Sequence, residues 1–363
     1  MFQEVTSEDA AASPGCRTRA VSVGSVAFFR RRDPDPPRAV QPPAPAPAPS
    51  VQPTPTLHNP TAEAFVAEIA AGDFAAASQR YQALPTHDLR TFVADRAVHL
   101  SFLEGSPADV PERVKEWTEV RPDDGVGWII RGGFGVSAAW AARGGARAQY
   151  VDADAWPTFF ELLNRAEEDL WRATELNPTD PAPWVPLLRT ARGLQVPKEE
   201  LRLRFEQMTR RDPNCFLGHQ QFLQGIADKW SGSHEEMFEF ARTVSASSPD
   251  GSPLHSLVVD AHLERWIDGR PKVQDYFWDA PAREFLAAAE RSVLSQAFVD
   301  DDLHPSGAMA RNVFAVGFGV SNQLRAAADQ CRLIGDRPDS WPWVYLGKTP
   351  AERFVLFSES GPD

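Results

Sequence analysis

The chain has 363 residues, of which 42% are hydrophobic and 24% are charged, and its formal net charge is −13. This composition is typical of a folded globular protein, and the acidic balance argues against nucleic acid or an anionic membrane surface as the main partner. The 3 cysteines form no Cys-x-x-Cys pair, so we expect neither a disulfide framework nor a cysteine zinc site. No apolar run approaches the ~20 residues of a membrane span, and we expect a cytoplasmic protein.

Residues 1–57 differ in composition from the rest of the chain. Ten of the 32 prolines fall between Pro34 and Pro55. Such a stretch favours extended polyproline II and cannot bury a core. We therefore expect a disordered Pro/Ala-rich tail, which acts either as a spacer or as a docking peptide for a proline-binding module.

From Asn59 onward, the apolar residues follow helical spacings. Leu89, Val93 and Ala97 recur in steps of four and mark one face of a helix, and Gly72 is placed to end an earlier helix. The chain contains no convincing run of alternating strands, so the sequence predicts an all-α fold.

Prolines recur at the junctions between the expected helices, with spacings of 56, 35, 36, 56 and 33 residues. They are Pro122, Pro178, Pro213, Pro249, Pro305 and Pro338. Three of these spacings are close to the ~34-residue period of tetratricopeptide helix pairs. In the clearest junction, Asp180 can cap a helix that begins at Pro181, and Trp184 can wedge between neighbouring helices. The repetition predicts helix pairs that stack to bury a continuous core.

The two 56-residue spacings correspond to the shorter unit plus roughly 22 residues. We assign the additional residues to inserts at about 143–157 and about 267–281, which carry Trp156, Tyr276 and Trp278. Aromatic side chains in loops are typical binding anchors, although the same side chains can fold back to cover a core. Both interpretations stay open at this point.

The pentapeptide Gly-Phe-Gly-Val-Ser occurs twice, at 133–137 and at 317–321. Neither copy has the third glycine or the preceding strand that a dinucleotide-binding site needs. We expect these glycines to permit close approach of neighbouring helices or to end a helix.

The junctions resemble tetratricopeptide repeats. Each has a helix-ending proline and a large residue at the fourth position of the next unit, followed by an apolar pair such as Leu187-Leu188. The sequence departs from that pattern where Leu188 replaces a small residue, and where Glu200 stands near the start of the second helix.

A narrower resemblance rests on the text Lys-Trp-Ser-Gly-Ser-His-Glu-Glu-Met at Lys229–Met237, together with Cys331–Pro338 and Trp343. These residues are similar to a family of uncharacterised bacterial proteins that carry a domain of unknown function built on such repeats. The resemblance covers roughly 59–350, and it implies a fold without supplying an activity.

These observations divide the chain into three parts. Residues 1–57 are the tail, residues 58–350 are the helical-repeat domain, and residues 351–363 are a C-terminal short helix or tail. The resemblance implies that the repeat domain is a tetratricopeptide-like α-solenoid of about seven helix pairs.

Ser233, His234 and Glu235 suggest a Ser/His/acid cluster at first. Ser233 and Glu236, however, form the pattern of a capping box, and residues on one helical turn do not give the geometry of a catalytic triad. We therefore expect Ser233 to cap a helix. His234 and Glu235 point elsewhere on that turn, near Trp230. This corner is therefore the first place at which to look for a ligand surface.

Histidines also gather in this region, which raises the question of a metal site. They are His219, His234, His255 and His262. His219 and His255 occupy the junction position that tryptophan takes elsewhere, which indicates packing. The chain has no His-Glu-x-x-His motif, so we expect no metal and no cofactor.

Two functions remain from different classes. The first is a non-enzymatic scaffold that binds a protein or a peptide, with Trp230, His234, Glu235, Trp156, Tyr276 and Trp278 as candidate contacts. This hypothesis expects a groove with an acidic lining that suits a basic or helical peptide. The alternative is a hydrolase or metal-dependent enzyme that uses Trp230, His234 and His262, with Asp260 or Glu235 as the acid. The oligomeric state stays open.

Overall fold

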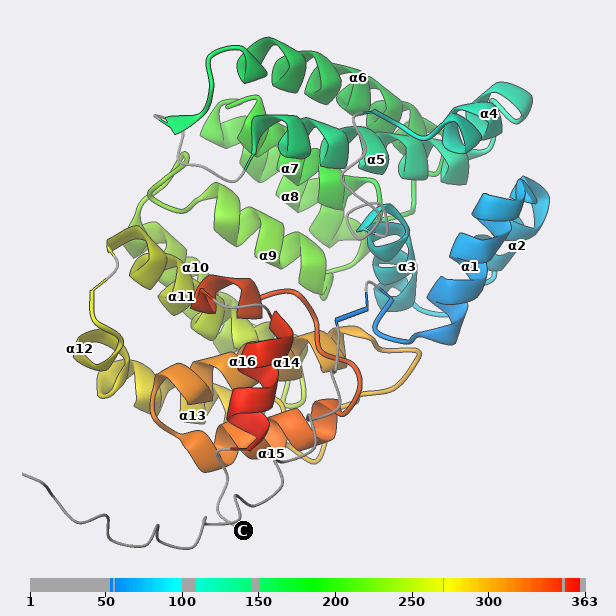
Figure 1. The fold of residues 1–363 in the computed structure, drawn as a ribbon. Helices are drawn as coiled ribbons and strands as arrows, with labels where there is room; N and C mark the ends of the chain where they lie inside the picture. Colours follow the sequence, from blue (N-terminus) through cyan, green and yellow to red (C-terminus); the bar gives the residue numbers. More distant parts are fainter. Residues whose placement is uncertain are drawn as a thin grey trace, which may run out of the picture. The chain divides into compact units, whose positions relative to one another are not determined.

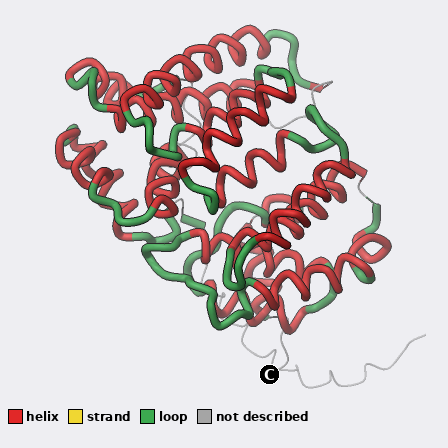
Figure 2. Tube along the Cα trace, turned by 180° about the vertical axis from the view of Figure 1, so that it is seen from behind, coloured by secondary structure: helices red, strands yellow, loops and turns green. Residues whose placement is uncertain are grey.

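The computed structural model describes residues 53–54, 56–99, 109–144, 150–269, 271–347 and 350–359. These residues form sixteen α-helices and contain no β-strand, which confirms the prediction of an all-α fold (Figures 1 and 2). Most of the predicted N-terminal tail lies outside the described residues. None of the described helices is both long enough and apolar enough to cross a lipid bilayer.

The first eight helices include the two longest, α5 and α6, which contact each other along their lengths. They are α1 (Pro60–Ala71), α2 (Phe74–Gln82), α3 (His87–His99), α4 (Glu112–Val120), α5 (Gly125–Arg143), α6 (Ala155–Leu176), α7 (Trp184–Gly193) and α8 (Lys198–Arg211).

The second eight helices are interrupted by two short 3-10 helices. They are α9 (Phe216–Gly225), α10 (His234–Ser247), α11 (Leu257–Gly269), α12 (Val273–Phe277), α13 (Ala280–Arg291), α14 (Ser306–Val320), α15 (Leu324–Ile334) and α16 (Pro350–Ser358). The 3-10 helices are η3 (Pro253–Ser256) and η4 (Trp343–Leu346). The C-terminal short helix expected from residue 351 corresponds to α16, which packs against α15 and η4.

Several helix ends follow directly from local chemistry. The Asn59 side chain accepts hydrogen bonds from the first backbone N–H groups of α1, and Gly72 ends that helix at φ 76°, a conformation that glycine adopts without strain. The Ser233 Oγ accepts from the backbone N–H of Glu236 at 3.1 Å and caps α10, as the sequence predicts.

The second half of the predicted capping box is absent. The Glu236 carboxylate accepts instead from Lys198 Nζ at 2.7 Å and from Arg202 Nη2 at 2.6 Å, both on α8. Two charged donors attract a carboxylate more strongly than one neutral backbone N–H does, so the tertiary contact replaces the local one.

The junction before α7 also differs from the prediction. Asp180 caps the turn, since its Oδ1 accepts from the backbone N–H of Ala182 at 2.9 Å. The helix itself begins at Trp184, three residues later than expected, and Pro181–Pro183 form a turn ahead of it. The Asp180 Oδ2 accepts from the hydroxyl of Tyr81 at 3.0 Å, which ties the junction to α2.

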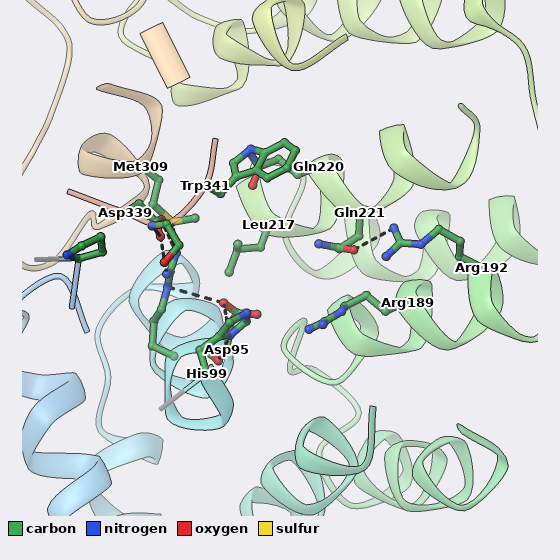
Figure 3. A pocket seen from close by; sticks show the side chains of 13 residues that line it. Asp95, His99, Arg189, Arg192, Leu217, Gln220, Gln221, Met309, Asp339 and Trp341 are labelled. Atoms are coloured by element: carbon green, nitrogen blue, oxygen red, sulfur yellow. Dashed lines mark hydrogen bonds and ion pairs between the residues drawn. The ribbon is translucent and has the colours of Figure 1, made fainter. Parts of the chain in front are cut away.

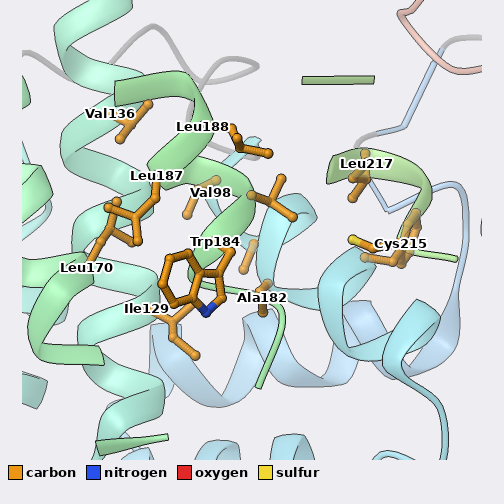
Figure 4. Close-up of a cluster of buried hydrophobic side chains, with 14 of the residues drawn as sticks. Val98, Ile129, Val136, Leu170, Ala182, Trp184, Leu187, Leu188, Cys215 and Leu217 are labelled. Atoms are coloured by element: carbon orange, nitrogen blue, oxygen red, sulfur yellow. The ribbon is translucent and has the colours of Figure 1, made fainter. Parts of the chain in front are cut away.

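The core is built from the apolar faces of successive helices. Figure 4 shows Trp184 and Leu187 of α7 with Leu170 of α6 and Ile129 of α5, all of them buried. Trp184 is 5% exposed and meets the ring of Trp171 edge to face, as a wedge between helices should. A second apolar cluster joins α11 to α16.

Glycines in α5 and α14 allow neighbouring helices to approach closely. A Cβ at Gly135 would lie 2.8 Å from the Cβ of Ala166, and one at Gly317 would lie 2.8 Å from a Val259 methyl group. The close-approach interpretation of the repeated pentapeptide is therefore confirmed, and the alternative of a helix end does not apply to the copy in α5, which continues to Arg143.

The predicted inserts only partly fall between helices. The first runs from the last residue of α5 into the first turn of α6, so Trp156 lies on a helix and not in a loop as expected, and residues 145–149 lie outside the described part of the chain. The second holds α12, and Phe277 at the end of that helix is fully buried in the second apolar cluster. This insert therefore covers a core, which was one of its two open interpretations.

Contacts between distant parts of the sequence add to those between neighbouring helices. The Asn59 Nδ2 donates to the carbonyl of Asp302 at 2.9 Å, and the backbone N–H of Ser306 donates to Asp88 Oδ2 at 3.2 Å. In an open repeat array each unit contacts only its neighbours. Here the first helices also contact the residues before α14, and this brings α3 close to the C-terminal part of the chain.

Candidate ligand-binding cleft

Two cavities of about 270 and 250 Å³ adjoin one another between α3, α7, α9, α11 and the segment at 339–345. Both are lined by Arg192, Gln220 and Trp341, so they form one continuous depression, which we call the cleft. Figure 3 shows side chains from α3 on one side of it and from α7 on the other.

Helical spacing explains which side chains reach the cleft. Arg189 and Arg192 are three residues apart on α7, and therefore lie on one face of that helix. The lining residues of α9 likewise recur at intervals of three and four. They are Leu217, Gln220, Gln221, Leu223 and Gln224.

One arginine of the cleft already binds a carboxylate of the same chain. Arg96 on α3 donates to both oxygens of Asp339, at 3.0 and 2.8 Å, and both side chains are buried. Burial works against the charge of Arg96, but the opposing charges of Asp339 and Asp95 outweigh it, so the pKa of Arg96 is raised.

Arg189 and Arg192 have no such carboxylate. Arg189 makes no ion pair or hydrogen bond to any residue that the structure describes, and Arg192 donates only to Gln221 Oε1, at 3.2 Å. The Nε of Arg192 is buried and has no hydrogen-bond partner within the described ranges. Two guanidinium groups therefore face the cleft without an ion pair to any described residue, although the charge of Asp95 acts on Arg189 and that of Glu264 acts on Arg192 (Figure 3).

Burial alters the titration of both arginines. It lowers the pKa of Arg189, and it lowers the pKa of Arg192 to about 10, where the positive charge of Arg189 acts in the same direction. Both groups remain protonated at neutral pH, so the cleft holds two positive charges that have lost much of their hydration. An anion bound there would restore the interactions that water no longer supplies.

The far wall of the cleft carries two buried carboxylates of α11. Asp260 accepts from Gln220 Nε2 at 2.9 Å and from Trp341 Nε1 at 3.2 Å, and burial raises the pKa of Asp260 to about 7. Glu264 accepts from the hydroxyl of Tyr345 at 2.7 Å and also from Lys229 Nζ. Asp260 lines the second cavity although it is only 2% exposed, whereas Glu264 is 3% exposed and lies behind the lining residues.

The structure brings together two of the candidate contacts, Trp156 and Trp230. Their rings lie 5.4 and 5.8 Å from the guanidinium carbon of Arg143, and Trp140 completes the cluster. Arg192 also lies over the rings of Trp140 and Trp230, at 5.1 and 5.6 Å. The ring of Trp230 thus packs against the guanidinium group of Arg192, which lines the cleft.

His234 and Glu235 lie at the start of α10. The Nε2 of His234 is 3.3 Å from Asp268 Oδ2, while Glu235 is exposed. Ligand atoms of Asp228, His234 and Asp268 all lie within 4.8 Å of one another, so these three residues could hold a metal ion.

Tyr276 and Trp278 have partners elsewhere in the chain. The Tyr276 hydroxyl lies 3.1 Å from His262 Nδ1, and the other nitrogen of that ring lies 2.9 Å from Glu284 Oε2. The Trp278 Nε1 donates to the carbonyl of Val320 at 3.2 Å, although half of the side chain remains exposed.

The residues proposed for the enzyme alternative do not converge on one another, because each has a different partner. Trp230 stacks on arginines, His234 pairs with Asp268, and His262 pairs with Glu284. Asp260, the acid proposed for that site, is bound to Gln220 and Trp341 instead.

Of the residues that line the cleft, the sequence analysis named only Asp260 as a site residue, and it did so for the enzyme alternative. The available signal was modest: a pair of arginines three apart on α7, and polar side chains at helical spacing on α9. Comparison of the sequence with protein-family models gives no match, and comparison with curated proteins gives none either.

Proposed function

We propose that this chain is a non-enzymatic, cytoplasmic binding protein that takes an acidic peptide segment of a partner protein in the cleft. Its framework would be a tetratricopeptide-like α-solenoid of about seven helix pairs, as in the bacterial family it resembles. The observation that carries the proposal is the pair Arg189 and Arg192, whose charges face the cleft without an ion pair to any described residue.

A carboxylate is the natural partner of these groups. The planar guanidinium offers paired N–H donors that match the two oxygens of a carboxylate. The chain uses this geometry in the same cleft, where Asp339 binds Arg96 through two hydrogen bonds. A glutamate or aspartate of a partner could bind Arg189 and Arg192 in the same manner.

The neighbouring amides favour a peptide as the carrier of that carboxylate. Gln221 and Gln224 line the cleft beside the arginines, and a side-chain amide can both donate to and accept from a peptide backbone.

The acidic lining expected from the sequence is present in part, since Asp95, Asp260 and Asp339 line the cleft. These carboxylates already have partners within the chain, whereas Arg189 and Arg192 have no ion pair to any residue that the structure describes. The proposed partner segment is therefore acidic rather than basic.

The test begins with a random-peptide display selection against the full chain. We expect the enriched peptides to contain more Asp and Glu than the starting library. The dissociation constant of one enriched peptide is then measured by fluorescence anisotropy for the wild type, Arg189→Gln and Arg192→Gln. Loss of a charged hydrogen bond should weaken binding by at least about tenfold.

Arg172→Gln on α6 is the matched control, because it removes an arginine whose ion partners, Asp123 and Glu175, are exposed. Circular dichroism of every variant checks that the fold is retained. The proposal fails when selection enriches no acidic peptide, or when both cleft variants bind the enriched peptide as tightly as the wild type does.

A second candidate function follows from Asp228, His234 and Asp268, whose ligand atoms come within 4.8 Å of one another. A metal ion held by one imidazole and two carboxylates would leave open positions for water, as a metal-dependent hydrolase needs. Elemental analysis of the purified full chain, with His234→Ala for comparison, tests this function. Less than stoichiometric metal in the wild type, or equal metal in both proteins, rejects it.

A further inference from the structure

The segment at 339–345 crosses the cleft, and we call it the strap. Two of its residues anchor it firmly: Asp339 binds Arg96, and Trp343 is fully buried and donates its indole N–H to Asn312 Oδ1 at 2.8 Å. The backbone N–H of Asp339 donates to the same Asn312 oxygen, at 3.1 Å. The strap is thus fixed to α3 and α14 at both of these points.

The other two aromatic residues of the strap, Trp341 and Tyr345, are partly exposed and line the cleft. Their rings meet edge to face, with centres 4.4 Å apart. Each donates one hydrogen bond to α11: Trp341 to Asp260 and Tyr345 to Glu264. Each donor thus occupies one oxygen of a buried carboxylate, and one of these carboxylates, Asp260, lines the cleft.

The hydrogen bonds from Trp341 and Tyr345 to the carboxylates of α11 influence which charge a ligand meets in the cleft. Without the Trp341 and Tyr345 donors, Asp260 would keep, among the described residues, only its hydrogen bond from Gln220, and Glu264 would keep only Lys229. The negative charge that already acts on Arg192 from Glu264 would then be less compensated. With the two rings in place, the carboxylates are hydrogen-bonded and buried, and the arginines stay available.

We propose that Trp341 and Tyr345 determine the charge specificity of the cleft, because they donate hydrogen bonds to Asp260 and Glu264 and leave Arg189 and Arg192 open to an anionic ligand. This inference rests on the proposed binding of an acidic peptide. It assigns a role in ligand selection to a part of the chain that lies far from α7 in the sequence. A strap whose rings are turned away would leave a cleft of mixed charge with little preference for anions.

The experiment compares a glutamate-containing peptide from the display selection with the same peptide carrying glutamine at each glutamate. Affinities are measured for the wild type and for the double variant Trp341→Phe/Tyr345→Phe at about pH 9, below the pKa of Arg192, because loss of the Trp341 hydrogen bond raises the pKa of Asp260 above its value of about 7. This variant keeps an aromatic ring at each position and both anchors but removes the two donors. We expect the preference for glutamate over glutamine to fall by about tenfold, because carboxylate oxygens that have lost their donors repel the peptide.

Trp266→Phe is the matched control, because it removes an indole donor from α11 that binds the Pro271 carbonyl at 2.9 Å, outside the cleft. An unchanged preference in the double variant overturns the role of the strap. Tighter binding of the acidic peptide by the double variant overturns it as well, because it would mean that Trp341 and Tyr345 hinder the ligand. Either result leaves the proposed function standing when Arg189→Gln and Arg192→Gln still lose affinity. A wild type with no preference for glutamate rejects the proposed function itself.

Discussion

At the scale of single residues, burial sets the behaviour of the charged groups around the cleft. Asp260 is the clearest case, since burial raises its pKa from an ordinary 3.8 to about 7, against the hydrogen bonds from Gln220 and Trp341. The folded chain thus holds a proton that the unfolded chain releases at lower pH. Asp260 therefore lowers the free energy of unfolding progressively as the pH rises from about 4 to about 7.

The variant Asp260→Asn should remove this dependence. Between about pH 5 and about pH 8, the free energy of unfolding should fall by on the order of 3 kcal/mol less in the variant than in the wild type. The amide can still accept from Trp341, and Gln220 can turn its own oxygen toward the new NH₂ group. Urea unfolding at both pH values measures the difference.

Glu239→Gln, an exposed position on α10, serves as the control and should leave the pH profile of the wild type unchanged. If Asp260→Asn also keeps that profile, the carboxyl group does not hold its proton in the folded chain near neutral pH.

At the scale of helices, local patterns predicted much of the structure. Gly72 and Ser233 mark helix ends by chemistry confined to a few residues, and both predictions are confirmed. The start of α7 was wrong by three residues because the turn at Pro181–Pro183 depends on local geometry that spacing does not encode. The cleft was not predicted because its walls come from distant parts of the sequence. Trp341, for example, comes 149 positions after Arg192 and donates to Asp260, and no local pattern contains such a contact.

The contact between α5 and α6 gives a prediction at this scale. Gly135→Ala should lower the free energy of unfolding by about 1–3 kcal/mol, because the new methyl group would lie 2.8 Å from the Cβ of Ala166. Chemical denaturation measures the loss. Gly269→Ala at the end of α11 is the control, since its Cβ would meet only the flexible end of Arg265 and the ring of Pro271. Equal stability of the two variants would show that α5 and α6 can separate without cost.

The N-terminal cap of α10 gives a second prediction at the scale of helices. Ser233→Ala removes the oxygen that accepts from Glu236 N–H and should cost about 1 kcal/mol, whereas Ser233→Asp should keep most of the stability. Thermal and urea unfolding of both variants measure the difference. Because Glu236 binds Lys198 and Arg202 instead of completing the capping box, Glu236→Gln should weaken the contact between α8 and α10 without removing the cap. A Ser233→Ala variant as stable as the wild type would contradict the role of the hydroxyl.

At the scale of the whole molecule, the charge of the chain opposes the charge of the cleft. The net charge is −13, while the unpaired groups that face the ligand are the arginines Arg189 and Arg192. An acidic peptide should therefore be repelled at long range and attracted only after it has entered the cleft. Electrostatic interactions between exposed charges decay over a Debye length of about 10 Å at 0.1 M salt, so the two effects act over different distances.

This separation predicts an unusual dependence of the binding kinetics on salt. Between about 20 and about 200 mM salt, the association rate of an acidic peptide should rise several-fold, because screening weakens the long-range repulsion. The dissociation rate should rise as well, since salt also weakens the contacts with Arg189 and Arg192. In the Arg189→Gln/Arg192→Gln variant, the association rate should keep its rise while the dissociation rate becomes nearly independent of salt. Stopped-flow measurements with a labelled peptide separate the two rates, and an association rate that falls with salt in the wild type would mean that attraction to the cleft already dominates at long range.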